Sequence, residues 1–309
     1  MNWVFIFGIA LVVCSGMLNA STRFLIKRMP NAHKFTIIGF GYLFALPWYA
    51  LWLSYEGIPV VDSSFWKIIA LSVPLLIVAN IMIVNAHRIA PMTLLASFLA
   101  LTPAFHLFTG YVMGVPTPRT LMGYIGVAVI VVGLYTINTR NGKLGLLEPF
   151  KQIYKNRGAF LMFLVALVFS VTANLDPMAM NASNIPFYLI VDHGLIALIA
   201  LGLRVYYVKR KGEQDEAILP WRPLVAFGLC LAFEVATHMC AFLFVPVVSY
   251  VISGKRLGTI LFAFAYGLYL GFSPRHREKN PGEREHLFPR VAGMTIAVIG
   301  MLMVIFQSH

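Results

Sequence analysis

The number and length of its apolar runs constrain this chain more than any other sequence feature. A helix that crosses a bilayer needs about 20 mainly apolar residues, and ten runs approach or exceed that length. In lipid, every backbone N–H and C=O must bond within the protein, and these runs lack the alternation of barrel strands. The sequence therefore predicts an all-α membrane protein with ten transmembrane helices, at residues 3–21, 35–54, 65–86, 90–113, 118–138, 158–178, 185–207, 223–244, 246–272 and 289–306.

The charge composition favours a membrane protein over a nucleic-acid-binding one. Only 12% of the 309 residues are charged, about half of the roughly 25% typical of soluble domains. Lys and Arg outnumber Asp and Glu by 24 to 12. These basic residues fall in short segments between apolar runs, which is a pattern of membrane topology. We therefore expect the lipid bilayer, and not nucleic acid, as a partner.

The basic residues also predict the orientation of the chain. Twenty of the 24 Lys and Arg residues lie after helices one, three, five, seven and nine, beginning with Arg23 and Lys27. The opposite loops hold only Lys67 and Arg119. Because cytosolic loops carry an excess of Lys and Arg, we expect the odd-numbered loops in the cytosol. Both termini are then on the outer side of the cell (inner) membrane.

The chain divides into two matched halves. The fifth and tenth predicted helices each carry two glycines seven residues apart, at Gly126 and Gly133 and at Gly293 and Gly300. We interpret this match as a duplication of five helices. An odd number of helices in each half makes the repeat inverted, as in many secondary transporters. The predicted units are a first repeat at 3–138, a basic linker at 139–157 and a second repeat at 158–306.

Two stretches resemble the EamA family of the drug/metabolite transporter superfamily. They are "APMTLLASFLALTPAFHLFTGYVMGVPTPRTLMGYIGVAVIVVGLY" and "VPVVSYVISGKRLGTILFAFAYGLYLGF", the latter followed by "RVAGMTIAVIGMLMVI". The resemblance covers nearly the whole chain as two tandem repeats. It implies ten helices in an inverted 5+5 arrangement around a central cavity with alternating access. It also implies a secondary transporter, commonly an exporter, for a small polar or anionic metabolite.

Lys255 and Arg256 lie in the middle of the ninth predicted helix. Charges at that depth cost about 2.5–3.5 kcal/mol each on insertion scales. Counting about 1.5 Å per residue from the turn near Val245, Glu234 lies at the same depth as the basic pair. Two interpretations stay open. Glu234 neutralises one base in an ion-paired core, or the spare base faces the cavity and binds an anionic group. In the second interpretation, the pair is similar to a phosphate-binding Lys-Arg pair of the related triose-phosphate translocators.

Other intramembrane polar residues are candidates for the same site. His238 lies one turn beyond Glu234, so the two are candidates for proton coupling. Asp192 either pairs with Lys255 or Arg256 in place of Glu234 or lines the cavity, and Gly194 suggests a local break or a close contact in that helix. Asn80 is the best candidate from the first half. Asp176 precedes a proline, so we expect it to cap or turn the end of its helix.

No enzyme signature or cofactor motif accompanies these residues. The sequence has no GxxxxGK[ST] phosphate loop, HExxH or GxSxG motif, so we expect neither an enzyme nor an ATP-driven pump, and no metal. The leading prediction is a metabolite transporter, as a monomer or homodimer. The alternatives are a flippase or carrier for an anionic lipid-linked substrate and a non-transporting membrane subunit.

Overall fold

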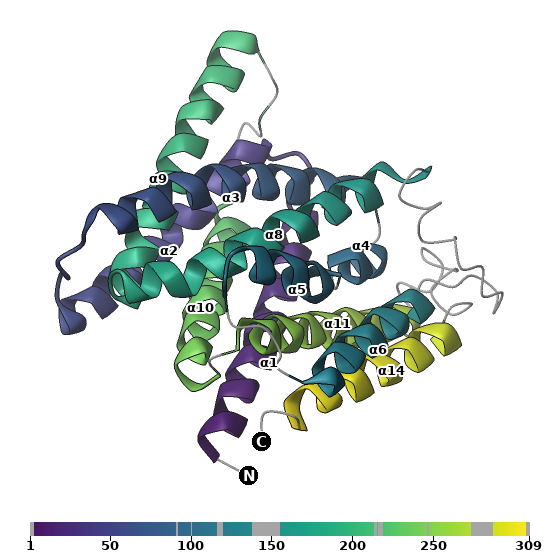
Figure 1. The fold of residues 1–309 in the computed structure, drawn as a ribbon. Helices are drawn as coiled ribbons and strands as arrows, with labels where there is room; N and C mark the ends of the chain where they lie inside the picture. Colours follow the sequence, from purple (N-terminus) through teal and green to yellow (C-terminus); the bar gives the residue numbers. More distant parts are fainter. Residues whose placement is uncertain are drawn as a thin grey trace.

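The fold is helical throughout the part of the chain that the structure describes. The computed structural model describes residues 3–90, 92–99, 101–115, 120–137, 155–212, 215, 219–245, 247–272 and 287–306, and these contain no strand. Most of the predicted linker at 139–157 lies outside the described residues. The basic segment 273–286 lies outside them as well. Helices from both halves of the sequence are interleaved in space (Figure 1).

Six helices are long and apolar enough to cross a membrane: α1 (Trp3–Lys27), α2 (Lys34–Glu56), α3 (Ser63–Ile89), α8 (Arg157–Asn181), α9 (Ile185–Val205) with its continuation η1 (Tyr206–Arg210), and α10 (Trp221–Phe244). The other described helices are α4 (Met92–Leu99), α5 (Thr102–Val112), α6 (Leu121–Ile137), α11 (Val248–Phe272) and α14 (Leu287–Phe306). This composition makes the chain an all-α protein of the multi-pass membrane type.

Two predicted helices need correction at a proline. The helix predicted at 90–113 is two helices, α4 and α5, with Pro103 in the first turn of α5. The first turn accepts proline because its N–H needs no partner within the helix, so Pro103 begins a helix there rather than kinking one. Conversely, α8 continues through Asp176 and Pro177 to Asn181. The expectation that Asp176 caps or turns the end of this helix is therefore wrong.

Glycine does not interrupt α9, which runs without a break through Gly194. The expected local break there is wrong, because glycine weakens a helix only modestly and neighbouring helices hold this one in place. The helix begins at the side chain of Asn184, whose oxygen accepts a hydrogen bond from the Phe187 N–H at 3.0 Å. Asp192 therefore occupies an ordinary interior position on a regular helix.

Helix α1 lies in the middle of the molecule, against α10 and α11 (Figure 1). Small residues bring α1 and α11 close together, since a Cβ added at Gly16 would collide with the Lys255 carbonyl oxygen. The Thr259 hydroxyl donates to the Gly16 carbonyl oxygen across this contact, at 3.1 Å. Close helix crossings at small residues are common in membrane proteins.

The two glycine pairs found in the sequence meet where α6 packs against α14. A Cβ added at Gly133 would lie 2.5 Å from the Gly293 carbonyl oxygen. One added at Gly300 would lie 2.6 Å from the Gly126 carbonyl oxygen. Gly133 and Gly300 therefore each leave room for the backbone of the facing helix.

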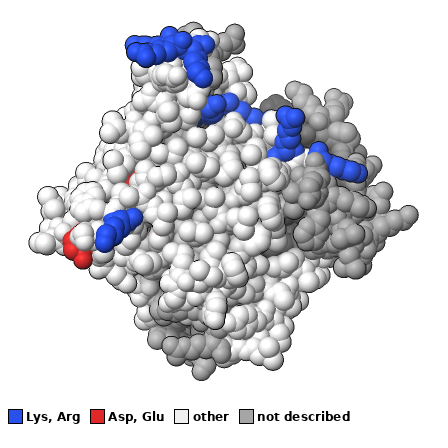
Figure 2. Space-filling view, turned by 45° about the horizontal axis from the view of Figure 1, so that its top comes forward, with Lys and Arg blue, Asp and Glu red and all other residues white. Residues whose placement is uncertain are grey.

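Basic side chains gather at one end of the bundle. The segments there are the C-terminal ends of α1, α3 and α9 and the N-terminal ends of α2, α8 and α10. In Figure 2 most of the visible Lys and Arg lie toward the upper part of the surface. Asp215 ties this end together, because it accepts hydrogen bonds from the His33 N–H at 2.8 Å, the Thr36 hydroxyl at 2.7 Å and Arg204 Nε at 2.9 Å.

Candidate functional site

A cavity of about 110 Å³ lies among α1, α2, α3, α5, α8, α9, α10 and α11. It draws residues from both halves of the sequence. All six side chains that the sequence singled out line it: Asn80, Asp192, Glu234, His238, Lys255 and Arg256. The structure thus brings together residues that lie up to 176 positions apart, counted from Asn80 to Arg256.

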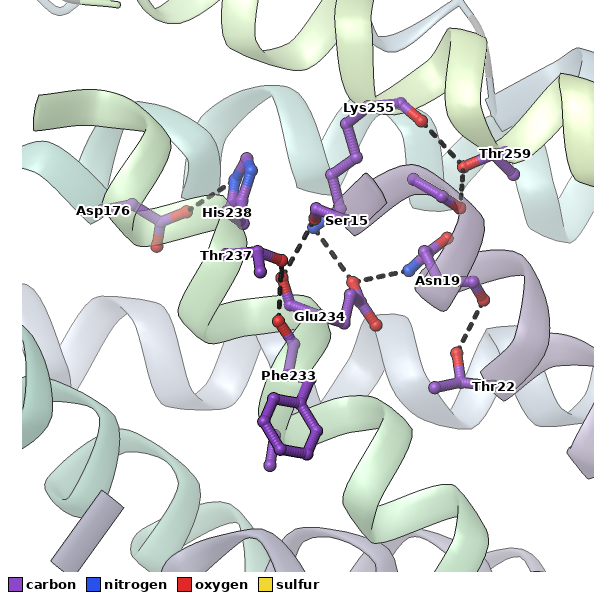
Figure 3. Close-up of polar contacts among 12 residues, drawn as sticks. Ser15, Asn19, Thr22, Asp176, Phe233, Glu234, Thr237, His238, Lys255 and Thr259 are labelled. Carbon is purple, nitrogen blue, oxygen red and sulfur yellow. Dashed lines mark hydrogen bonds and ion pairs between the residues drawn. The ribbon is translucent and has the colours of Figure 1, made fainter. Parts of the chain in front are cut away.

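Lys255 forms an ion pair with Glu234, as the depth argument predicted. The Lys255 Nζ lies 3.0 Å from Glu234 Oε1 (Figure 3). Helix α1 contributes as much as the α10–α11 hairpin, because Asn19 donates to the same oxygen at 2.7 Å. The Ser15 hydroxyl donates to the Glu234 backbone carbonyl at 3.0 Å. Glu234 Oε2 accepts no hydrogen bond from the described residues.

Arg256 is the spare base of the pair. Its residue is 5% exposed, and its Nε and Nη1 donate to no acceptor among the described residues. Its guanidinium carbon lies 5.5 Å from the centre of the Phe169 ring, a cation–π contact that fixes its orientation. An acid partner within ion-pair distance is missing from the described part of the chain. Arg256 thus presents an uncompensated charge to the cavity.

Arg23 is a second buried arginine in the cavity, and the sequence analysis missed it. The prediction placed it in a cytosolic loop, but α1 continues to Lys27 and leaves Arg23 only 7% exposed. Its Nε has no hydrogen-bond partner among the described residues. The apolar residues that follow it, Phe24, Leu25 and Ile26, were the available signal that the helix extends past this arginine.

The acidic side of the cavity is built by α8 and α9. Asp192 accepts a hydrogen bond from the Ser72 hydroxyl at 3.2 Å and does not pair with Lys255 or Arg256. Asp176, which was expected to cap a helix end, lines the cavity and accepts a bond from the Tyr188 hydroxyl at 2.7 Å. The position of Asp176 inside a long apolar run was a sequence signal for a buried acidic residue. The proline that follows it led instead to the prediction of a helix end.

His238 and Asn80 complete the polar lining. His238 Nε2 lies 4.0 Å from Asp176 Oδ2, at the limit of an ion pair (Figure 3). Its Nδ1 has no hydrogen-bond partner among the described residues. Asn80 donates to the Tyr42 hydroxyl and to the Leu76 carbonyl, both at 2.8 Å. Asn80 therefore contacts none of the other predicted site residues.

The cavity is lined by charged side chains, and the described residues form no metal-binding cluster. Within the described ranges, no three His, Cys, Asp or Glu residues are grouped to hold a metal ion. The polar groups come instead as an ion pair, two unpaired guanidinium groups and two carboxylates. Such intramembrane charges mark substrate or ion pathways in membrane proteins.

Comparison with known proteins supports the fold alone. No family model and no curated protein matches the chain. A solved chain described only as "Crystal structure of protein" is similar, with a TM-score of 0.61 and 13% sequence identity. The match covers 97% of this chain and 98% of that one. At this identity the likeness concerns the fold alone, over nearly the full length.

Proposed function

We propose that this chain is a secondary transporter that moves a small polar or anionic metabolite across the cell membrane by alternating access. The observation that carries the proposal is the cavity, in which two buried arginines, Arg23 and Arg256, have no acid partner among the described residues. Burying a charge without a partner is costly, and a mobile anionic group supplies that partner. In this proposal, Glu234 and His238 are the candidates for proton coupling.

We also propose the ten-helix inverted repeat and the membership in the EamA family. The helix contacts support the repeat, because α1 packs on α10 and α11, while α8 packs on α3, α4 and α5. Exchanging the halves 3–138 and 158–306 converts the first set of contacts into the second. The pairs α2–α9 and α6–α14 convert into themselves. An inverted repeat with its site between the halves is a recurrent transporter design.

The size of the cavity favours a small solute over the alternative substrates. Its volume of about 110 Å³ is below the roughly 300–1,000 Å³ of drug-sized ligand sites. A lipid-linked substrate needs more room for its head group, together with a lateral opening. A non-transporting subunit gives no reason to keep uncompensated charges in its core. The metabolite transporter therefore accounts for the most observations.

The proposed orientation places the basic end in the cytosol and both termini outside. Moving Arg23 from a loop into the cavity leaves that end strongly basic, with Lys34, Arg88 and Arg222 among its residues. The other end has Lys67 among its described residues. The positive-inside rule then gives the same orientation as the sequence did. Alternating access leaves the direction open, and export is the direction that the family resemblance implies.

Ligand-dependent stability of the purified protein tests this function. The unfolding temperature in detergent is measured against phosphorylated metabolites, organic acids, amino acids and drugs, because a ligand of the folded state raises it by mass action. We expect a small metabolite to stabilise the wild type but not Arg23→Gln or Arg256→Gln. Lys67→Gln, at the opposite end and outside the cavity, is the matched charge-loss control. If only lipids or drugs stabilise the protein, the proposal is wrong.

A further inference from the structure

We infer that the substrate is a small zwitterion, with an acidic group and an ammonium group on one molecule. This inference rests on the proposed transport function and deepens it. It follows from the distribution of charge around the cavity, where three Lys or Arg side chains and three Asp or Glu side chains meet: Arg23, Lys255, Arg256, Asp176, Asp192 and Glu234. Lys255 and Glu234 neutralise each other at 3.0 Å. Two arginines and two aspartates remain.

The two arginines belong to one wall of the cavity, formed by α1 and α11. Both are more than nine-tenths buried, and both have N–H groups that donate to no described residue. A guanidinium group offers five N–H donors in a planar fork that fits a carboxylate or phosphate. This wall therefore receives the acidic group.

The two aspartates belong to a different wall, formed by α8 and α9. Each has one oxygen bonded to a hydroxyl, from Tyr188 to Asp176 and from Ser72 to Asp192. The described residues donate no hydrogen bond to the second oxygen of either aspartate. His238 Nε2 lies 4.0 Å from that oxygen of Asp176, and no described Lys or Arg lies within ion-pair distance of either aspartate. An ammonium group has three N–H donors and needs such acceptors. This wall receives the basic group.

Charge balance then selects the substrate. A simple anion compensates the arginines but leaves Asp192 without a positive partner and Asp176 with only His238, at 4.0 Å. A simple cation leaves both arginines without a negative one. Leaving a buried polar or charged group unpaired is what makes a site reject a close analogue. A molecule that is neutral in total but carries both charges satisfies both walls at once.

Matched ligand sets test this inference. Glycine, β-alanine and γ-aminobutyrate are each compared with the hydroxy acid that replaces the ammonium group and the amide that removes the acid. Binding is measured from the ligand dependence of the unfolding temperature, and exchange from counterflow in proteoliposomes. We expect at least one amino acid to bind about tenfold or more tightly than both of its analogues. The volume of about 110 Å³ suits ligands of this size.

Charge-removing variants separate the two walls. Asp176→Asn/Asp192→Asn is expected to lose the preference for the amino acid over the hydroxy acid, while Arg23→Gln/Arg256→Gln loses it over the amide. Lys67→Gln retains both preferences. If hydroxy acids or phosphorylated anions bind the wild type as tightly as the amino acids, the zwitterion inference fails and the transport proposal stands. If none of these solutes binds or exchanges, both fail.

Discussion

Removing Lys255 while leaving Glu234 in place is the sharpest test of how the core of this protein is held together. The substitution Lys255→Met keeps the length and apolar stem of the side chain but removes the charge that lies 3.0 Å from Glu234 Oε1. The side chains of Lys255 and Glu234 are 13% and 4% exposed, so water replaces the lost partner poorly. The change leaves the Glu234 carboxylate without a base within ion-pair distance among the described residues.

The expected loss of stability follows from the remaining contacts. Breaking a buried ion pair by removing one partner costs about 3–5 kcal/mol. Asn19 still donates to the same oxygen at 2.7 Å, and the cavity lies alongside, which places the loss near the lower end, at about 3 kcal/mol. Adding Glu234→Gln removes the orphaned charge and keeps an oxygen that accepts from Asn19. The double variant is therefore expected to recover about 2 kcal/mol of that loss.

The measurement is a double-mutant cycle of unfolding free energies in bicelles, with Lys255→Met, Glu234→Gln and the double variant beside the wild type. Lys67→Met, at an exposed helix end, controls for the loss of a lysine as such. An unfolding free energy of Lys255→Met within about 1 kcal/mol of wild type, with no gain in stability in the double variant, would refute a stabilising core ion pair. Both singles must be folded, which circular dichroism checks.

Three further predictions concern the helices around the cavity. Gly133→Val should strongly destabilise the α6–α14 contact, because an added Cβ meets the Gly293 carbonyl. Gly202→Val should be tolerated, because the space at its Cβ is open. Size-exclusion chromatography in detergent distinguishes a folded variant from a misassembled one. Asn184→Ala should cost about 1 kcal/mol by removing the N-cap of α9, measured by the same unfolding assay. Burial raises the pKa of Asp215, but hydrogen bonds from His33, Thr36 and Arg204 outweigh it and lower the pKa below the ordinary 3.8. The stability that this carboxylate contributes is present above pH 3.8 and is lost as the pH falls through the lowered value. The unfolding free energy of Asp215→Asn, measured against pH, should lack that acid-dependent loss.

The sequence predicted those parts of the protein that local composition determines. Hydropathy predicted the six helices that are long and apolar enough to cross a membrane. The equal depths of Glu234 and Lys255 predicted a contact that the structure contains. Two side chains show where such reasoning fails. Arg23 looked like a loop residue because basic residues commonly end transmembrane helices, and Asp176 looked like a cap because proline follows it. Their place in the cavity depends on how helices from opposite halves pack, which no local pattern encodes.

Asn19 shows the same limit for a contact that the sequence analysis did not predict. Its bond to Glu234 joins residues 215 positions apart, and it exists because α1 packs against both α10 and α11. The sequence analysis assumed that the α10–α11 hairpin alone brings acid and base together. The central position of α1 follows from the tertiary arrangement of the two halves. A contact between polar residues on helices remote in sequence therefore requires the fold before it can be identified.

The balance of charge in the cavity also predicts how transport responds to voltage. Three Lys or Arg and three Asp or Glu side chains line the cavity. Its formal charge is therefore zero when His193 and His238, which also line it, are counted as neutral, and a bound zwitterion leaves it zero. Moving one net charge through a membrane potential is worth about 2.3 kcal/mol per 100 mV, but a neutral carrier–substrate complex moves none. We therefore expect zwitterion exchange in proteoliposomes to keep the same rate when valinomycin and a potassium gradient impose a potential. A rate that changes with potential would mean that an ion accompanies the substrate, and Glu234→Gln and His238→Gln would then identify whether that ion is a proton carried by this pair.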